Sequence, residues 1–137
     1  MEEEPKRKTI LVVEDERPLI EAIRSRLDQN GFDVLTARTI PQAKVYLEDI
    51  ETIDAVWLDH YLLGQETGLD LVHTMKGDGA KWKNIPIFVV SNTASDDKVR
   101  SYLRLGITKY YVKSEKRLDS IIPDIKAFLD GHAASED

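Results

Sequence analysis

The chain has 137 residues, of which 42% are hydrophobic, which is enough for one domain around one core and too short for two domains. Its 19 Lys and Arg against 25 Asp and Glu give a formal net charge of -6, which disfavours nonspecific binding to nucleic acid or anionic lipid. The absence of cysteine excludes disulfides, thiolate metal sites and a cysteine nucleophile. No leader is evident, and no apolar run approaches the roughly 20 residues that span a bilayer. These features predict a soluble, cytoplasmic protein with no membrane insertion and no direct nucleic-acid partner.

Five short segments are predicted to form strands. Segment 32–37 ends at Arg38 and is expected to be an edge strand away from any site. The other four are apolar runs followed by chemically useful residues: 10–13 before Glu14 and Asp15, 54–58 before Asp59, 87–90 before Ser91, and 110–112 before Lys113. Continuous apolar strands separated by helices indicate a parallel sheet covered on both faces, and therefore an α/β fold.

Five helices are predicted to alternate with these strands, on the evidence of caps, prolines, glycines and apolar spacing. In the last helix Ser120 is the expected N-cap, because Pro123 would then be the third helical residue, where its missing N–H is harmless. The predicted helices run from about Pro18 to before Gly31, from after Thr39 to Ile50, from Gly68 to Met75, from after Ser95 to before Gly106, and from Ile121 to Leu129.

The apolar residues of these helices mark the faces that are expected to be buried. Trp82, in a polar link, is expected to be a partly packed loop aromatic. The expected buried residues of the first, second and fourth helices are Ile20, Ile23 and Leu27; Ala43, Leu47 and Ile50; and Val99, Tyr102 and Leu103.

One domain is predicted, from residue 9 to residue 130. The charged segment 1–8 is too polar to pack and is expected to be a flexible N-terminal tail. Residues 131–137 are expected to be a short flexible C-terminal tail.

Glu14, Asp15, Asp59, Ser91 and Lys113 follow four different strands and are expected to converge at one edge of the sheet. Taken singly, each has an ordinary explanation, such as a charge near a helix start or a solvated side chain. Together, three carboxylates, a hydroxyl and an ammonium suit the binding of a divalent cation and the handling of a phosphoryl group. Carboxylate and carbonyl oxygens favour Mg²⁺. Asp59 is the candidate nucleophile, because a carboxylate can form an aspartyl phosphate.

From about Thr9 to Leu129 the sequence resembles the receiver domain of two-component response regulators. The family implies a flavodoxin-like (βα)5 fold, with a doubly wound parallel five-stranded sheet in the order 2-1-3-4-5. The resemblance is carried by Val12-Val13-Glu14-Asp15-Glu16, Leu58-Asp59, Val90-Ser91 and Tyr110-Tyr111-Val112-Lys113, in that order along the chain.

The resemblance also implies a chemical role for five residues. Asp59 would accept a phosphoryl group from a phosphohistidine. Lys113 would contact a phosphate oxygen. The Mg²⁺ ligands would be Glu14, Asp15, Asp59 and the backbone carbonyl of Tyr61.

Two further residues would respond to phosphorylation of Asp59. Ser91 would bond the phosphoryl group, and Tyr110 would rotate inward and alter the face formed by helix four, strand five and helix five. The implied partners are a histidine kinase or a histidine phosphotransfer protein, and a downstream protein target on that face. Such a module catalyses only its own phosphorylation and dephosphorylation.

Several positions depart from the usual receiver pattern. The loop after Asp59 has Leu62-Leu63-Gly64 in place of the common proline, and Asn92 occupies a place usually held by a small residue. Ser114 replaces the proline that normally follows the lysine, which removes the usual stabiliser of a cis bond there. The resemblance implies that Tyr61 and Thr93 line the path of the hydrolytic water. Neither carries a carboxylate or carboxamide, so slow self-dephosphorylation is expected. The alternative is that Asn92 or another group orients the water and these two positions matter little.

Two other functions compete with a signalling module. A phosphohydrolase of the haloacid dehalogenase type would also form an aspartyl phosphate, but it usually has a second aspartate two residues after the nucleophile, where this chain has Tyr61. A flavodoxin-like electron carrier would need a phosphate loop rich in Gly, Ser and Thr after the first strand. The acidic Glu14-Asp15-Glu16 would repel a flavin phosphate.

The three histidines give no sign of a metal site. His60, His73 and His132 are scattered and lack metal-ligand spacing. His60 follows Asp59 directly and is expected to be an ordinary loop histidine.

Overall fold

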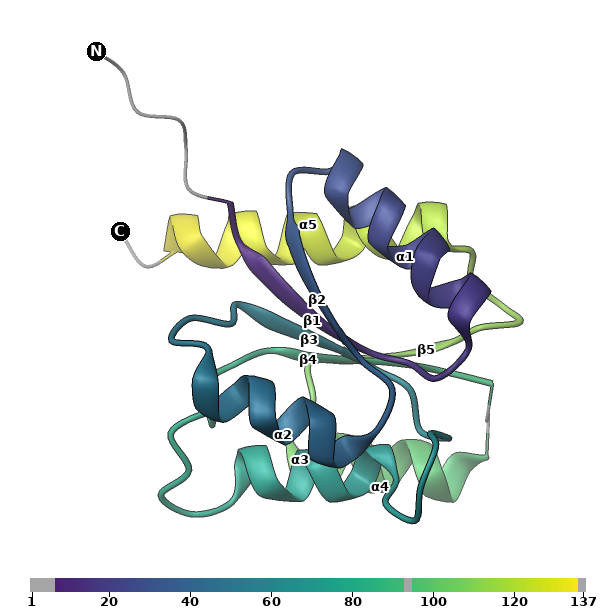
Figure 1. Ribbon diagram of the computed structural model, residues 1–137, viewed down its shortest axis with the longest axis vertical. Coiled ribbons are helices and arrows are strands. Elements are labelled where there is room, and N and C mark those ends of the chain that lie inside the picture. The colour runs from purple at the N-terminus through teal and green to yellow at the C-terminus, as the bar shows by residue number, and fades with distance from the viewer. Residues whose placement is uncertain (1–6, 93–94, 136–137) are drawn as a thin grey trace.

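The computed structural model describes residues 7–92 and 95–135, which form a parallel five-stranded sheet between two layers of helices (Figure 1). The strand order is β2-β1-β3-β4-β5, so the order expected from the family resemblance is confirmed. Because the chain runs outward from β1 to β2 and then the other way from β3 to β5, the order reverses between β1 and β3. The strands are β1 Thr9–Val13, β2 Asp33–Ala37, β3 Ala55–Leu58, β4 Ile87–Ser91 and β5 Lys109–Val112.

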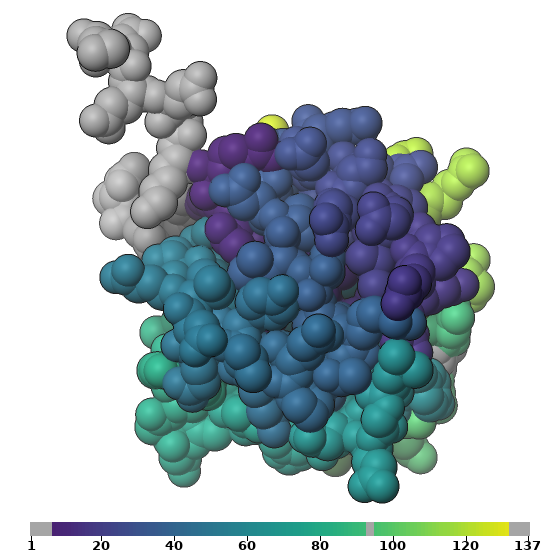
Figure 2. Space-filling view, in the orientation of Figure 1, coloured from purple at the N-terminus to yellow at the C-terminus, as the bar shows by residue number. Residues whose placement is uncertain are grey.

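Helices α1 and α5 cover one face of the sheet, and α2, α3 and α4 cover the other (Figure 1). In the space-filling view, the surface that faces the reader is formed largely by α1, β2 and α2 (Figure 2). The helices are α1 Arg17–Gln29, α2 Ile40–Asp49, α3 Gly68–Lys76, α4 Asp96–Leu105 and α5 Leu118–Ser135. No helix in the described part of the chain is both long and apolar enough to cross a membrane.

The central strands are apolar throughout because both of their faces are covered. Successive side chains of a strand point to opposite faces. In β3, Val56 and Leu58 pack in the cluster under α2, α3 and α4, whereas Ala55 and Trp57 pack in the cluster under α1 and α5. The continuous apolar runs in the sequence are thus explained by two cores, one on each side of the sheet.

Local signals set the starts of α2 and α4 as expected. The hydroxyl of Thr39 accepts a hydrogen bond from the backbone N–H of Gln42, and the hydroxyl of Ser95 accepts one from Lys98. α4 ends at Gly106, whose φ of 97° lies in the left-handed region that glycine adopts without strain. These interactions fix where the helices begin and end relative to the strands.

The last helix differs from the prediction. α5 begins at Leu118 and continues to Ser135, so it is longer at both ends than the predicted 121–129, and part of the predicted C-terminal tail is helical. Pro123 therefore lies inside the helix, where a proline costs about 3 kcal/mol. The buried isoleucines of α5 pack against the sheet and offset this cost, because each contributes about 1.5–3 kcal/mol.

Two residues predicted to be buried are exposed. Leu103 of α4 is 51% exposed because the inward position of that turn is taken by Tyr102, which is completely buried. Ile50 is the C-cap of α2, where the chain leaves the helix, and its side chain is also exposed. The other expected contacts of α1 and α2 are confirmed. Trp82 is partly packed and donates a hydrogen bond from its indole to the carbonyl of Leu47 at 3.1 Å.

The end of the predicted N-terminal tail is anchored. Arg7 forms ion pairs with Asp28 at 2.8 Å and Asp33 at 3.2 Å, and Lys8 accepts a backbone hydrogen bond from Asp33. These contacts hold Arg7 and Lys8 against the start of β2, so the prediction of a free tail is wrong for both residues. The rest of that predicted segment, residues 1–6, lies outside the described residues, as do residues 136 and 137.

Candidate functional site

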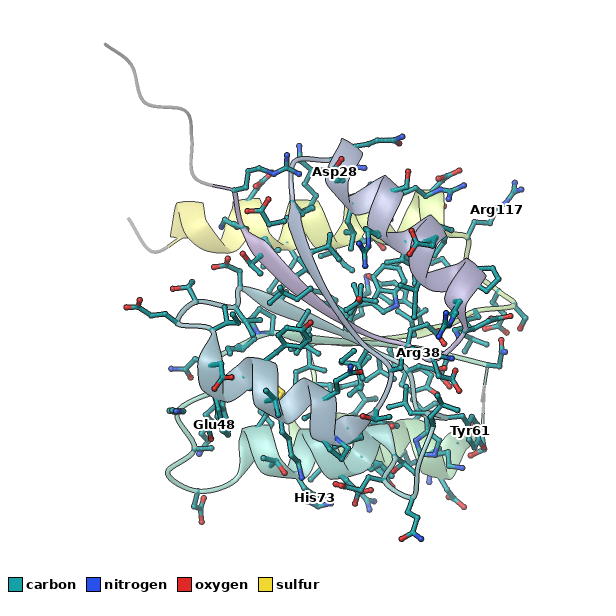
Figure 3. All side chains as sticks on the ribbon, viewed as in Figure 1. Asp28, Arg38, Glu48, Tyr61, His73 and Arg117 are labelled. Carbon is teal, nitrogen blue, oxygen red and sulfur yellow. The ribbon has the colours of Figure 1, made fainter. Side chains whose placement is uncertain are left out.

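The residues singled out in the sequence meet at the edge of the sheet where the strands end. Backbone pairing continues one residue beyond the strands: the N–H of Asp59 donates to the carbonyl of Val13 at 3.0 Å, and that of Lys113 donates to Ser91 at 2.8 Å. The residues after β3 and β5 are thereby held in register with the ends of β1 and β4. Arg38, after β2, and Tyr61, after β3, lie at this same end of the molecule (Figure 3).

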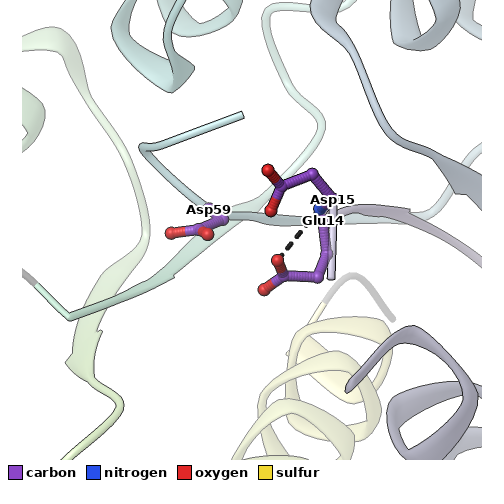
Figure 4. Close-up of side chains that lie close together, drawn as sticks. All are labelled: Glu14, Asp15 and Asp59. Atoms are coloured by element: carbon purple, nitrogen blue, oxygen red, sulfur yellow. Dashed lines mark hydrogen bonds between the residues drawn. The ribbon is translucent and has the colours of Figure 1, made fainter. Parts of the chain in front are cut away.

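Three carboxylates form the centre of the site. Glu14, Asp15 and Asp59 each offer an oxygen, and these oxygens all lie within 4.8 Å of one another (Figure 4). Glu14 is 1% exposed and Asp59 is 5% exposed, whereas Asp15 is half-buried. They follow β1 and β3, the strands between which the strand order reverses, and this is where open α/β sheets bind their ligands.

Lys113 supplies positive charge to this cluster. Its ammonium lies 2.6 Å from Glu14 Oε1 and 3.2 Å from Asp59 Oδ2. Burial lowers the pKa of Lys113, but the bond to Glu14 and the charge of Asp59 outweigh this and raise the pKa above its ordinary value. Burial also raises the pKa of Glu14, while Lys113 opposes that rise. The lysine therefore remains protonated and partly neutralises two buried acids.

Backbone N–H groups orient both buried carboxylates. Glu14 Oε2 accepts hydrogen bonds from the N–H of Asp15 at 2.9 Å (Figure 4) and from that of Glu16 at 3.2 Å. Asp59 Oδ1 accepts one from the N–H of His60 at 2.7 Å. Because each carboxylate is held by both the backbone and Lys113, neither is free to rotate.

A pocket of about 390 Å³ opens above these groups. Besides the three acids and Lys113, it is lined by Glu16, Tyr61 and Asn92. Tyr61 lies at its mouth with a side chain that is 55% exposed. Lys98 of α4 sits over the Tyr61 ring, 5.1 Å from the centroid, and donates a hydrogen bond to the Tyr61 hydroxyl at 3.1 Å. Tyr61 and Lys98 thus form a bridge between the loop after β3 and α4.

Ser91 and Tyr110 lie beside the pocket on β4 and β5. Ser91 is fully buried, and its Oγ has no hydrogen-bond partner among the described residues. Tyr110 is half-buried, and burial raises the pKa of its phenol above the ordinary value. A buried hydroxyl without a partner is costly, so Ser91 would gain from any group that supplied one.

His60 is not the ordinary loop histidine that was predicted. Its side chain is 4% exposed, and its Nδ1 lies 2.5 Å from the hydroxyl oxygen of Tyr102 on α4. Burial and the charge of Lys98 lower the pKa of His60, which keeps the ring neutral. The sequence offered no sign of this contact beyond the apolar position of Tyr102 on its helix.

The positions at which the sequence departs from the receiver pattern lie around the pocket and in the loops after β3 and β5. Within the described residues every peptide bond is trans, and this includes the bond between Lys113 and Ser114. Asn92 lines the pocket and is exposed. Leu62 packs against the core, while Leu63 is exposed. Thr93, predicted to flank the path of the hydrolytic water, lies outside the described residues.

Comparisons with known proteins identify the family of this chain. The family model of the response regulator receiver domain matches residues 10–124. The chain is 33% identical over 104 residues to the alginate biosynthesis transcriptional regulatory protein AlgB of Pseudomonas aeruginosa, a match that covers 76% of this chain and 22% of AlgB. It is 30% identical over 105 residues to the chemotaxis protein CheY1 of Helicobacter pylori, covering 76% of this chain and 83% of CheY1.

A solved structure has the same fold. The phosphorylated cyanobacterial phytochrome response regulator RcpA superimposes with a TM-score of 0.76 at 25% sequence identity, covering 90% of this chain and 91% of RcpA. The chain spans less than a quarter of AlgB but most of CheY1. Since the family model matches residues 10–124 of the 137-residue chain, the chain belongs to the receiver domains of two-component response regulators.

Proposed function

We propose that Asp59 accepts a phosphoryl group from a phosphohistidine donor and that the modified domain acts through protein partners. The observation that carries this proposal is the convergence of Glu14, Asp15 and Asp59 within 4.8 Å, with the ammonium of Lys113 3.2 Å from Asp59. The phosphorylated state of RcpA supports it by analogy.

Asp59 is the best placed of the three acids to act as nucleophile. Both oxygens of Glu14 are engaged, one by Lys113 and the other by two backbone N–H groups, and the side chain is almost completely buried. Asp59 lines the pocket and contacts the ammonium that would meet a phosphoryl oxygen. In the reaction, a bond forms between an Asp59 oxygen and phosphorus while the bond from phosphorus to the donor histidine nitrogen breaks. Lys113 would stabilise the charge on the transferred group.

The residues present fit a Mg²⁺ site. Hard divalent cations take oxygen ligands, and the cluster offers three carboxylates at the open pocket. Glu14, Asp15, Asp59 and the backbone carbonyl of Tyr61 would hold the ion, and Tyr61 lines the same pocket. When bound, Mg²⁺ supplies positive charge to the phosphoryl oxygens. Asp15 and Asp59 would otherwise repel each other, so the ion also relieves the cluster itself.

Ser91 and Tyr110 are proposed to respond to the phosphoryl group. The unpartnered hydroxyl of Ser91 would gain a hydrogen bond from its own O–H to a phosphoryl oxygen. Tyr110 would then move inward, toward the place that the Ser91 hydroxyl leaves. The change would appear on the face formed by α4, β5 and α5, where Leu103 is 51% exposed and where Arg104 and Lys109 are also exposed.

The proposed partners are a histidine kinase or a histidine phosphotransfer protein as donor and a protein target on that face. The proposal includes no catalytic activity beyond the domain's own phosphorylation and dephosphorylation. In place of the second aspartate of a phosphohydrolase, the chain has Tyr61, whose hydroxyl is occupied by Lys98. Among the described residues of the site, none favours the phosphohydrolase.

The experiment measures phosphoryl incorporation from a purified histidine phosphotransfer protein in the presence of Mg²⁺. Wild type should form a base-labile acyl phosphate, and Asp59→Asn should form none. Asp54→Asn is the matched control, because Asp54 is a half-buried acid at the opposite end of the same strand, bonded to the N–H of Thr9 at 2.7 Å. Equal incorporation into wild type and Asp59→Asn would refute the assignment.

A further inference from the structure

The residue after the phosphoacceptor is built into the core through a polar contact. His60 does not line the acidic pocket, and its side chain instead reaches α4, where its Nδ1 meets the hydroxyl of Tyr102 at 2.5 Å. The two rings lie edge to face with centroids 5.6 Å apart. Tyr102 is completely buried, so both polar groups are satisfied by each other and are shielded from water.

A glycine makes room for this contact. Gly68 is the first residue of α3, and its N–H donates to the carbonyl of His60 at 3.1 Å. A Cβ atom at Gly68 would lie 2.6 Å from the Tyr102 hydroxyl and 2.7 Å from the carbonyl oxygen of Asp59. Both distances are shorter than van der Waals contact. The end of β3, the start of α3 and the middle of α4 are therefore pressed together around one hydroxyl group.

Tyr102 also touches the proposed reporter residue. Its ring centroid lies 5.7 Å from that of Tyr110 on β5, with the ring planes at 52°. The Tyr102 ring, on the inner side of α4, thus contacts both His60, which follows β3, and Tyr110 on β5. Side chains in such close packing cannot move independently.

His60 also contacts the carboxylate of Asp59, the proposed phosphoacceptor, through its backbone. The N–H of His60 donates to Asp59 Oδ1 at 2.7 Å, and Lys113 holds the other oxygen at 3.2 Å. Attaching a phosphoryl group to either oxygen removes the carboxylate charge. Because hydrogen bonds to a charged acceptor are roughly twice as strong as neutral ones, the hold on the His60 backbone weakens at that moment.

We propose that the hydrogen bond between His60 and Tyr102 couples the state of Asp59 to the position of α4 and of Tyr110. His60 and Tyr102 are positioning residues in this proposal, acting beside Ser91. The inference rests on the proposed function, since it concerns how phosphorylation of Asp59 is transmitted. In this proposal the signal passes from the Asp59 carboxylate through the backbone of His60 to Tyr102, and no contact with the phosphoryl oxygens is needed.

A purely space-filling role would not require this pair. Two apolar side chains of similar size would fill the same volume without the desolvation of an imidazole and a phenol. Removing one partner leaves the other buried and unpaired, so the contact holds the backbone at His60 and α4 in one arrangement. The decisive measurement is the response to modification of Asp59 in variants that lack the bond.

The test uses the whole chain with Mg²⁺ and saturating trifluoroberyllate, an analogue of the phosphoryl group, and records backbone amide shifts. In Tyr102→Phe the pocket amides near Asp59 should shift as in wild type, while the shifts of the α4 amides and of Tyr110 should be smaller by about twofold or more. Tyr111→Phe is the matched control, because Tyr111 is a buried tyrosine on β5 whose hydroxyl bonds Asp124 on the opposite side of the sheet. It should keep the full α4 response.

A second pair of variants keeps the test decisive if Tyr102→Phe fails to fold. An asparagine amide can occupy the place of the imidazole Nδ1, whereas leucine cannot, so His60→Asn should retain the α4 response and His60→Leu should lose it. Full α4 shifts in both Tyr102→Phe and His60→Leu would overturn the coupling. If wild type itself shows no pocket shifts, the proposed phosphoacceptor function fails instead, which separates the two outcomes.

Discussion

The ammonium of Lys113 lies 2.6 Å from a carboxylate oxygen of Glu14, although 99 positions separate the two residues in the chain. The contact joins the ends of β1 and β5, which are not neighbours in the sheet. It also brings the ammonium within 3.2 Å of Asp59, which follows β3, one of the two strands that lie between β1 and β5 in the sheet. One cation therefore partly neutralises two buried acids, and Asp15, which lines the same pocket, is the third acid of the proposed Mg²⁺ site.

Replacing Lys113 should destabilise the protein when no metal is present. Lys113→Met leaves Glu14 and Asp59 buried without a counter-charge, and breaking a buried pair costs about 3–5 kcal/mol. Chemical denaturation without Mg²⁺ should show this loss in the free energy of unfolding, and Mg²⁺ should recover much of it.

The control for that measurement is an exposed ion pair. Lys81 lies 3.0 Å from Glu48 with both side chains more than half exposed, so Lys81→Met should change stability by less than about 1 kcal/mol. Equal losses in the two variants would show that the Lys113 contacts contribute no more than a surface pair.

Asp15 should govern the response to metal. In the described part of the chain its carboxylate has no ion-pair partner, so it adds uncompensated negative charge to the cluster. Asp15→Asn should raise the metal-free stability and reduce the gain on adding Mg²⁺. A ligand that binds only the native state stabilises it by about 2.7 kcal/mol at a hundredfold excess over its dissociation constant. Thermal melts in a Mg²⁺ titration measure both effects, and identical responses of wild type and Asp15→Asn would exclude Asp15 as a ligand.

A methyl group at Gly68 should disturb the contact between β3, α3 and α4. In Gly68→Ala the new Cβ meets the Asp59 carbonyl at 2.7 Å, and a backbone atom cannot move aside as a side chain can. We expect a loss of about 1–3 kcal/mol, typical of overpacking. Gly131→Ala is the control: that residue lies in α5 with nothing within 4 Å of its Cβ position, so alanine should be neutral or stabilising by up to about 1 kcal/mol. Denaturation curves in which the two variants lose equal stability would contradict the steric explanation.

The bridge between Tyr61 and Lys98 should slow the loss of the phosphoryl group. Tyr61 lines the pocket, its ring and hydroxyl are held by Lys98, and it offers no carboxylate or amide to orient a water. Tyr61→Asn should speed the decay of phosphorylated protein several-fold, and Lys98→Met should speed it to a smaller extent by releasing the Tyr61 ring. Decay is followed after removal of the donor, at constant Mg²⁺. Lys126→Met, on the exposed side of α5, should decay like wild type. A decay in Tyr61→Asn that is unchanged or slower would count against a covering role.

Much of this fold could be predicted from short stretches of sequence. The strands are recognisable because parallel strands buried on both faces must be apolar throughout, and the caps Thr39 and Ser95 act on backbone groups only three residues away. The convergence of Glu14, Asp59 and Lys113 could also be predicted, because parallel strands bring the residues that follow them to one edge of the sheet. These features depend on local chemistry and on a topology with few alternatives.

Other features depended on how the elements pack. Leu103 and Tyr102 are adjacent apolar residues, and only the position of α4 against β5 and the loop after β3 decides that the tyrosine is buried and the leucine exposed. Pro123 lies inside α5 because packing of that helix on the sheet outweighs one lost backbone hydrogen bond. His60 became a core residue for a similar reason: its partner lies 42 positions away, and a glycine at 68 leaves the space that lets them meet. The sequence by itself determined the strands and the acids at their ends, whereas contacts between distant side chains, each worth only a few kcal/mol, were decided by the tertiary structure.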